Sequence, residues 1–272
     1  MNQAVTRQPA VSGLFYPGDR SGLQQTVSDL LADAPRSHMQ HRSPKALIAP
    51  HAGYDYSGLP AAIAFATLEP IASTIRRVIL IGPSHRVAFS GIATSGADCF
   101  ATPLGMVVQD AALRETAEEL PYVTRLDEAH AQEHSLEVEL PFLQSLLPAF
   151  TFVPLVVGDA TADEVAAVLA GLWGDDDTII IVSSDLSHFL SYGQAREIDR
   201  ATANAIESLA PQAISSQMAC GHQPIKGLLT LARTRTLTAQ TLALMNSGDT
   251  SGSRDRVVGY GAFAFYEPEP SN

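Results

Sequence analysis

Four short apolar runs constrain the fold of this chain more than any other feature of its sequence. They do not alternate with polar residues, each contains or is followed by Gly, Pro or Ser, and they cover 45–50, 77–84, 151–158 and 178–188. Such runs are typical of central strands that are covered on both faces of a sheet. The sequence therefore predicts a central sheet that is largely parallel or mixed.

Amphipathic segments separate these runs, with apolar residues every three or four positions. Helices are predicted at 21–34, 58–72, 111–120, 134–147, 161–173 and 193–209. Thr161 and Glu164 have the spacing of a capping box at the start of one of them. A last apolar run at 257–268 is interpreted as a closing strand. The alternation of strand and helix patterns predicts an α/β fold with helices flanking the sheet.

One domain is expected over residues 1–272, with its core at about 8–266, because no repeat and no Pro-, Gly- or Ser-rich linker divides the chain. The polar segments 36–44 and 245–256 are expected to be surface loops.

Composition excludes several classes of function. The chain has 17 Lys+Arg against 29 Asp+Glu, a net charge of −12, whereas binding to a phosphate backbone needs a basic face. We therefore expect no nucleic-acid partner.

The N-terminal segment lacks the apolar core of a signal peptide, and no run of about 18 apolar residues occurs. A cytoplasmic protein without a membrane contact is expected, with Cys99 and Cys220 as free thiols.

Histidines follow three of the predicted strands. His51 follows the run at 45–50, His85 follows the run at 77–84, and His188 ends the run at 178–188, three residues after Asp185. Ligands of open α/β sheets bind at the carboxyl ends of the strands. A lone histidine there is most often a hydrogen-bonded loop residue or a helix cap. Three at equivalent positions favour a shared metal or catalytic site.

Cys220 lies in a turn at 218–225 and offers a further donor. Most free cysteines are small buried hydrophobes, and Cys99 is interpreted in that way. A thiolate with two neutral imidazoles would suit iron, copper or zinc better than magnesium or calcium.

The segment 127–141 carries a second group of histidines and glutamates. If a helix begins near Ser135, Glu133 and Glu137 fall near one face of it. His134 is a candidate for the surroundings of the site, and Glu139 is expected on a solvated acidic face.

Serine chemistry is the main alternative mechanism, because four serines lie beside these histidines and Asp185: Ser84, Ser183, Ser184 and Ser187. A serine nucleophile usually occupies a sharp G-x-S-x-G turn, which is absent from this sequence. These serines are better interpreted as caps of the following helices.

Several segments together resemble the Memo family, whose bacterial and archaeal members are called AmmeMemoRadiSam system protein B. The matching segments are RQPAVSGLFYPGD (7–19), APHAGYDYSG (49–58), GPSH (82–85), EHSLEVELPFL (133–143), SSDLSH (183–188), CGHQPI (220–225) and DRVVGYGAFAF (255–265). They span nearly the whole chain. The resemblance implies a fold similar to that of class III non-heme iron extradiol dioxygenases.

The same resemblance implies roles for individual residues. His51, His85 and Cys220 would be the metal ligands, with iron the leading metal and copper or zinc as alternatives. His188 would be the acid/base residue, Asp185 would orient or tune it, and His134 would line the pocket. The family's naming also implies association with a radical SAM protein.

A cysteine in place of the carboxylate of extradiol enzymes changes the chemistry, because a thiolate is softer and oxidisable. Catechol cleavage is therefore not carried over, and redox chemistry on the bound metal, or metal holding, is expected, with a small-molecule substrate of unknown identity. Two other functions remain open. One is a non-catalytic, metal-dependent adaptor, and the other is a zinc hydrolase in which His188 activates a metal-bound water.

Overall fold

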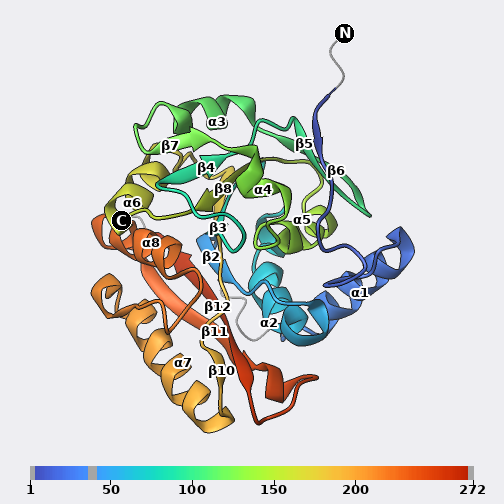
Figure 1. Cartoon of the computed structure of the whole chain (residues 1–272), viewed down its shortest axis with the longest axis vertical. Helices are drawn as coiled ribbons and strands as arrows, with labels where there is room; N and C mark the ends of the chain where they lie inside the picture. Colours follow the sequence, from blue (N-terminus) through green and yellow to red (C-terminus); the bar gives the residue numbers. More distant parts are fainter. Residues whose placement is uncertain (1–3, 36–41, 269–272) are drawn as a thin grey trace.

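The computed structural model describes residues 4–35 and 42–268. The outermost residues of the expected domain and most of the expected loop 36–44 lie outside these ranges. Within them the chain forms one α/β unit around a mixed sheet (Figure 1).

The strands are β1 (Thr6–Arg7), β2 (Pro44–Ala49), β3 (Arg77–Pro83), β4 (Ile92–Thr94), β5 (Cys99–Thr102), β6 (Gly105–Gln109), β7 (Val123–Arg125), β8 (Thr151–Val157), β9 (Thr178–Ser183), β10 (His188–Leu190), β11 (Thr238–Asn246) and β12 (Val257–Tyr266). The α-helices are α1 (Arg20–Asp33), α2 (Tyr54–Ala66), α3 (Ala111–Glu118), α4 (Asp127–Ala131), α5 (Leu140–Leu146), α6 (Ala162–Gly171), α7 (Tyr192–Glu207) and α8 (His222–Thr234). Short 3₁₀ turns include η2 (Glu69–Ile71), η3 (Glu137–Glu139), η4 (Pro211–Ala213) and η5 (Ser247–Asp249).

The sheet order is β1-β5-β6-β8-β3-β9-β2-β12-β10, with β11 paired to β12 and β4 paired to β7 and β8. Neighbours β8, β3, β9 and β2 are parallel, whereas β12 runs antiparallel to β2. The expectation of a largely parallel or mixed sheet is confirmed. Because β3, β9 and β2 are adjacent and parallel, the loops that follow them meet at one edge.

Both faces of the central strands are covered, which explains their continuous apolar sequence. Successive residues of a strand point to opposite faces. In β9, Ile179 and Ile181 belong to the cluster that includes α1, α2 and α5, whereas Ile180 and Val182 belong to the cluster with α6 and α8. Figure 1 shows these two helix groups on opposite sides of the strands.

Several elements differ from the sequence expectations. Helix α2 begins at Tyr54, four residues before the expected start, and the helix expected at 134–147 is reduced to η3 and α5. The run 178–188 splits, because the chain leaves β9 after Ser183 and pairs again as β10, antiparallel to β12. Strand β11 and helix α8 were not expected, and β11 enters the predicted loop 245–256. The capping box at Thr161 is confirmed.

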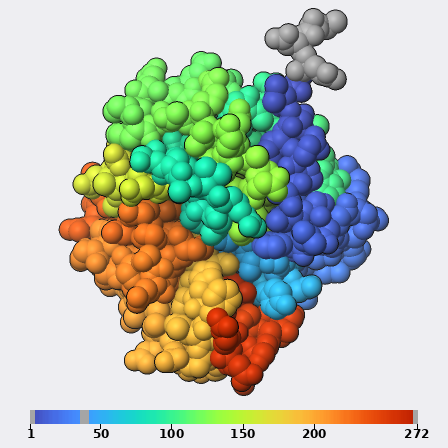
Figure 2. Space-filling model, viewed as in Figure 1, coloured from blue at the N-terminus to red at the C-terminus, as the bar shows by residue number. Residues whose placement is uncertain are grey.

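Segments distant in sequence share one face of the molecule. Figure 2 shows blue N-terminal residues packed beside green residues from the middle of the chain. Across residues 4–35 and 42–268, none of the helices combines the length and apolar character needed to cross a bilayer.

Candidate metal centre

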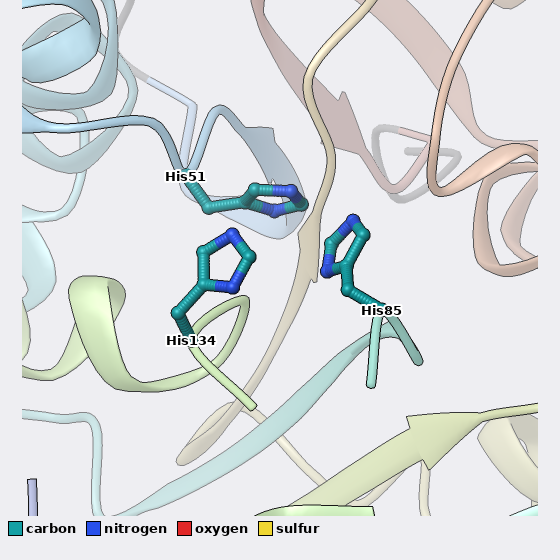
Figure 3. A group of neighbouring side chains, drawn as sticks. All are labelled: His51, His85 and His134. Carbon is teal, nitrogen blue, oxygen red and sulfur yellow. The ribbon is translucent and has the colours of Figure 1, made fainter. Parts of the chain in front are cut away.

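Three histidine rings meet at the sheet edge (Figure 3). His51 follows β2, His85 follows β3, and His134 lies between α4 and η3. Their ring centroids are 5.1 Å (His51–His85), 5.4 Å (His51–His134) and 4.7 Å (His85–His134) apart. One possible ligand nitrogen from each ring lies within 4.8 Å of the others. We call these three residues the histidine site.

Burial keeps two of these rings neutral. The pKa of His51 is well below its ordinary value because the ring is desolvated and because His85, His134 and His188 are close. Burial also lowers the pKa of His134 to about 4, despite the opposing charge of Glu133. Neutral imidazole is the form that binds a metal ion.

Hydrogen bonds occupy the outer nitrogen of two rings. Nδ1 of His51 lies 2.7 Å from Ser183 Oγ, and Nδ1 of His85 lies 2.9 Å from Oε1 of Glu133. Metal-binding histidines generally use their second nitrogen in this way. Nε2 of His51 and Nε2 of His85 thus remain as possible ligands.

Glu133 is the buried carboxylate that organises this part of the site. Its oxygens accept the backbone N–H groups of His85 (2.6 Å), His134 (2.9 Å) and Ser135 (2.9 Å). Burial alone would raise its pKa, but the hydrogen bonds and charge of His85 and the N–H of Ser135 outweigh burial and lower the pKa to about 2. These bonds also hold residues 133–135 outside the helix expected there.

Cys220 adjoins the histidine site. Its Sγ lies 3.3 Å from Nε2 of His51 and 3.6 Å from the carbonyl oxygen of Asp185. Burial raises the pKa of the thiol to about 12, and the Asp185 carboxylate contributes. A metal ion bound at the histidine site would lower the pKa of the thiol and favour the thiolate, which is the form that binds metals strongly. Cys99 is buried elsewhere, against Thr6.

Asp185 and His188 take separate positions. The Asp185 carboxylate accepts the backbone N–H of His51 (2.8 Å), and burial raises its pKa to about 7. His188 has its Nδ1 2.8 Å from the carbonyl oxygen of Leu186, and burial lowers its pKa. Among the hydrogen bonds of the described residues, none joins Asp185 to His188. Asp185 was expected to orient His188, but no direct hydrogen bond between the two supports this. The Asp185 carboxylate holds the backbone of His51 instead.

The expectation for Glu139 is wrong. Instead of lying on a solvated face it is 1% exposed, with Oε1 2.9 Å from Ser183 Oγ. Ser183 contacts His51 through the same oxygen, so both residues belong to the surroundings of the site. The sequence signals for these two residues were the serines beside the histidines, which include Ser183, and the family-like segments 183–188 and 133–143, but neither signal placed Ser183 or Glu139 behind His51.

Two hollows differ in their relation to this site. A cavity of about 280 Å³ lies beside Cys220, with Ser84, Phe89, His222 and Gln223 among its lining residues. A wider hollow of about 620 Å³ lies between α1 and the α5–β8 connection, and its lining residues include no histidine, cysteine or carboxylate. Of these two hollows, the smaller one adjoins Cys220.

The donor set fits a transition metal. Imidazole nitrogens with a thiol sulfur suit iron, copper or zinc, whereas magnesium and calcium prefer oxygen ligands. Nδ1 of His134 is buried without a hydrogen-bond partner, although Oε1 of Glu133 is 3.4 Å away. This nitrogen thus lies beside the carboxylate oxygen that also bonds Nδ1 of His85.

Comparison with known proteins identifies the family. The sequence model described as "Memo-like protein" matches residues 7–264. The chain belongs to the Memo-like family. Relatives named "MEMO1 family protein" include one from Aquifex aeolicus (strain VF5), 33% identical over 93% of this chain and 97% of that relative. Another, from Methanosarcina barkeri, is 35% identical over 94% of this chain and 98% of the relative. The resemblance deduced from the sequence motifs is confirmed.

A solved structure also aligns with this Memo-like protein. It is described as "uncharacterized protein JW3007 from Escherichia coli K12", with a TM-score of 0.49 and 14% identity over 81% of this chain and 99% of that chain. A likeness of this size carries no argument about function.

Proposed function

We propose that this Memo-like protein binds one transition-metal ion through His51, His85 and Cys220, with redox-active iron the leading metal and copper or zinc as alternatives. The observation that carries the proposal is the convergence of three histidine nitrogens within 4.8 Å, with the Cys220 sulfur 3.3 Å from one of them. His134 faces the same point and either completes the donor set or lines the pocket.

The bound ion would supply Lewis acidity and one-electron chemistry, and the chain would supply positioning and proton transfer. His188 has its Nδ1 proton directed to the Leu186 carbonyl, which leaves Nε2 as a base. Its lowered pKa keeps it unprotonated near neutral pH, so it can take a proton from a substrate. Asp185 fixes the backbone from which the His51 ring projects.

The cavity beside Cys220 is the proposed place for a small-molecule substrate. Its volume of about 280 Å³ is near the lower limit of ordinary ligand pockets, which is about 300 Å³. Phe89 and Pro224 give it apolar walls, and Ser84 and Gln223 are polar. A compact organic molecule with one apolar side fits this lining.

The proposal also includes a cellular compartment and a protein partner. The Cys220 thiol needs a reducing compartment to remain a ligand, which is consistent with the cytoplasm. The likeness to AmmeMemoRadiSam proteins supports a radical SAM protein as partner. Copurification of the two proteins from cells that make both tests this partnership.

Elemental analysis of anaerobically purified protein tests the metal site. We expect one iron, copper or zinc ion per chain in the wild type, and loss of most of it in His51→Ala and Cys220→Ser. His222→Gln is the matched control, because it removes a neighbouring histidine that is outside the proposed ligand set. Wild-type protein without metal after reconstitution would contradict the proposal.

Catalysis is tested separately from metal binding. His188→Ala is expected to retain the metal and to lose turnover of any redox substrate found for the wild type. If His188→Ala and the wild type bind a partner protein equally in a metal-dependent way, the adaptor function is favoured. Stoichiometric zinc with hydrolytic activity would favour the hydrolase.

A further inference from the structure

One hydroxyl group behind the histidine site has three close partners. Ser183 Oγ lies 2.7 Å from Nδ1 of His51, 2.6 Å from the carbonyl oxygen of Ser135 and 2.9 Å from Oε1 of Glu139. Ser183 and Glu139 are 0% and 1% exposed. Bulk solvent does not reach either side chain, so the hydrogen bonds among these groups are assigned from their own protons.

A count of protons assigns the donors. A serine hydroxyl donates once and accepts twice, and a carbonyl oxygen only accepts. The 2.6 Å contact with Ser135 therefore takes the Ser183 proton, because two bare oxygens would repel at that distance. His51 and Glu139 must then donate to Ser183 Oγ. This requires a proton on Nδ1 of His51 and a proton on Glu139.

The surroundings of Glu139 agree with a neutral acid. Its Oε2 is buried without a hydrogen-bond partner, which costs much less for a carbonyl oxygen than for a charged carboxylate oxygen. Burial raises the pKa of Glu139 well above its ordinary value, and the Asp185 carboxylate adds to this despite the Ser183 hydrogen bond. Among the ion pairs of the described residues, none includes Glu139.

We propose that Ser183 and Glu139 are positioning residues for His51: Glu139 is a neutral acid that donates to Ser183, and Ser183 receives the Nδ1 proton of His51. His51 then presents an unprotonated Nε2 toward His85, His134 and Cys220. The importance of this lone pair for metal binding rests on the proposed function, whereas the two proton positions do not depend on it.

Two measurements on metal-free protein test the proton positions. Nitrogen-15 NMR of the imidazoles, with His51 assigned by the signals lost in His51→Ala, is expected to show the Nδ1–H tautomer. Infrared spectroscopy at about pH 9 is expected to show the band of a protonated carboxyl group. Burial raises the pKa of Asp185 to about 7 and that of Asp199 to about 6, so both are mainly ionised at this pH and do not contribute to the band. Glu139→Gln should remove this band, and Glu118→Gln should not.

Metal affinity tests the consequence for His51. We expect Glu139→Gln to bind the metal within about threefold of the wild type, because a neutral donor replaces a neutral donor, and Ser183→Ala to bind about 10- to 100-fold more weakly. A loss of more than about tenfold in Glu139→Gln would mean that an ionised Glu139 balances the metal charge, and would overturn the proposal.

The outcomes separate the two proposals. An Nε2–H tautomer of His51, or a wild-type spectrum without the carboxyl band, overturns the positioning role even if the metal binds. A wild type that binds no metal, but shows both proton positions, contradicts the metal site alone. Neither spectral measurement uses Ser183→Ala, so the test of the proton positions does not depend on the stability of that variant.

Discussion

Two buried glutamates on the same 3₁₀ turn, Glu137 and Glu139, are in opposite electrostatic situations. Glu137 accepts hydrogen bonds from the Arg7 guanidinium, the Tyr16 hydroxyl and two backbone N–H groups, those of Ala10 (2.7 Å) and Val11 (3.0 Å). We call this group, centred on Arg7 and Glu137, the N-terminal clamp. Among the hydrogen bonds of the described residues, the Glu139 side chain takes part in one, with Ser183, and its Oε2 has no hydrogen-bond partner.

The comparison shows that a cluster in which every charge has a hydrogen-bond partner can hold in place a neighbouring cluster in which some polar atoms have none. Arg7 also donates to the carbonyl oxygens of His130 and Glu133. The N-terminal clamp thus fixes the 130–137 segment that presents His134. The paired charges of the clamp stabilise the fold, whereas the imidazole nitrogens of the histidine site are available to a ligand.

The largest expected effect is at the N-terminal clamp. Glu137→Gln leaves the Arg7 guanidinium, 6% exposed, without its carboxylate, and breaking a buried pair costs about 3–5 kcal/mol. Urea unfolding measures the change in the free energy of unfolding. A loss below about 1 kcal/mol would remove the contrast between the two glutamates.

A pH-dependent effect follows for His130, which lies beneath the clamp with Nε2 3.1 Å from the Ala93 carbonyl oxygen. Burial lowers its pKa from 6.5 to about 4, so between these values the unfolded chain binds a proton that the folded chain does not. Stability is therefore full above pH 6.5 and falls by about 3 kcal/mol as the pH drops to 4. The difference between wild type and His130→Gln, measured by urea unfolding across this range, isolates the contribution. Parallel curves would contradict it.

A smaller effect is expected at Glu139. Because a neutral amide replaces a neutral acid, Glu139→Gln should change the free energy of unfolding by no more than about 1 kcal/mol. Thermal and urea unfolding of metal-free protein measure this change. A gain of several kcal/mol would instead indicate that a buried, uncompensated charge had been removed.

The smallest effect is expected for an exposed ion pair, which extends the comparison to the surface. Arg125 donates to both oxygens of Glu118 (3.1 and 2.6 Å), and its side chain is 48% exposed. Solvent screens such a pair, so Glu118→Gln should cost about 0.2–1 kcal/mol, and added salt should reduce the cost. A loss equal to that of Glu137→Gln would show that burial is not the deciding factor.

The fold was predictable from the sequence where a local run of apolar residues corresponds to a strand that is buried on both faces. Continuous apolar runs marked β2, β3, β8 and β9, because strands covered on both faces need no polar residues. The antiparallel hairpin of β5 and β6 is short and partly exposed, so its residues carry no comparable pattern. Strand β10 was merged with β9, since the chain turn after Ser183 is set by pairing with β12, a contact across about 70 residues.

The site was predictable in part for the same reason. His51 and His85 follow strands that sequence reasoning located, so their meeting at one edge followed from parallel topology. His134 was expected only nearby, because the bonds of Glu133 to the His85 and Ser135 backbones determine where its loop turns. The proposed ligand roles stay predictions.

The sequence by itself determined the α/β class, the order of the central strands along the chain, and the residue types available at their carboxyl ends. Tertiary structure alone decided which of two glutamates, separated by one residue, is matched by Arg7 and which is left beside Ser183. The physical reason is that protonation and partnership of a buried polar group depend on neighbours brought from elsewhere in the chain. Arg7 and Glu137 are 130 positions apart, a separation over which local sequence patterns carry no information.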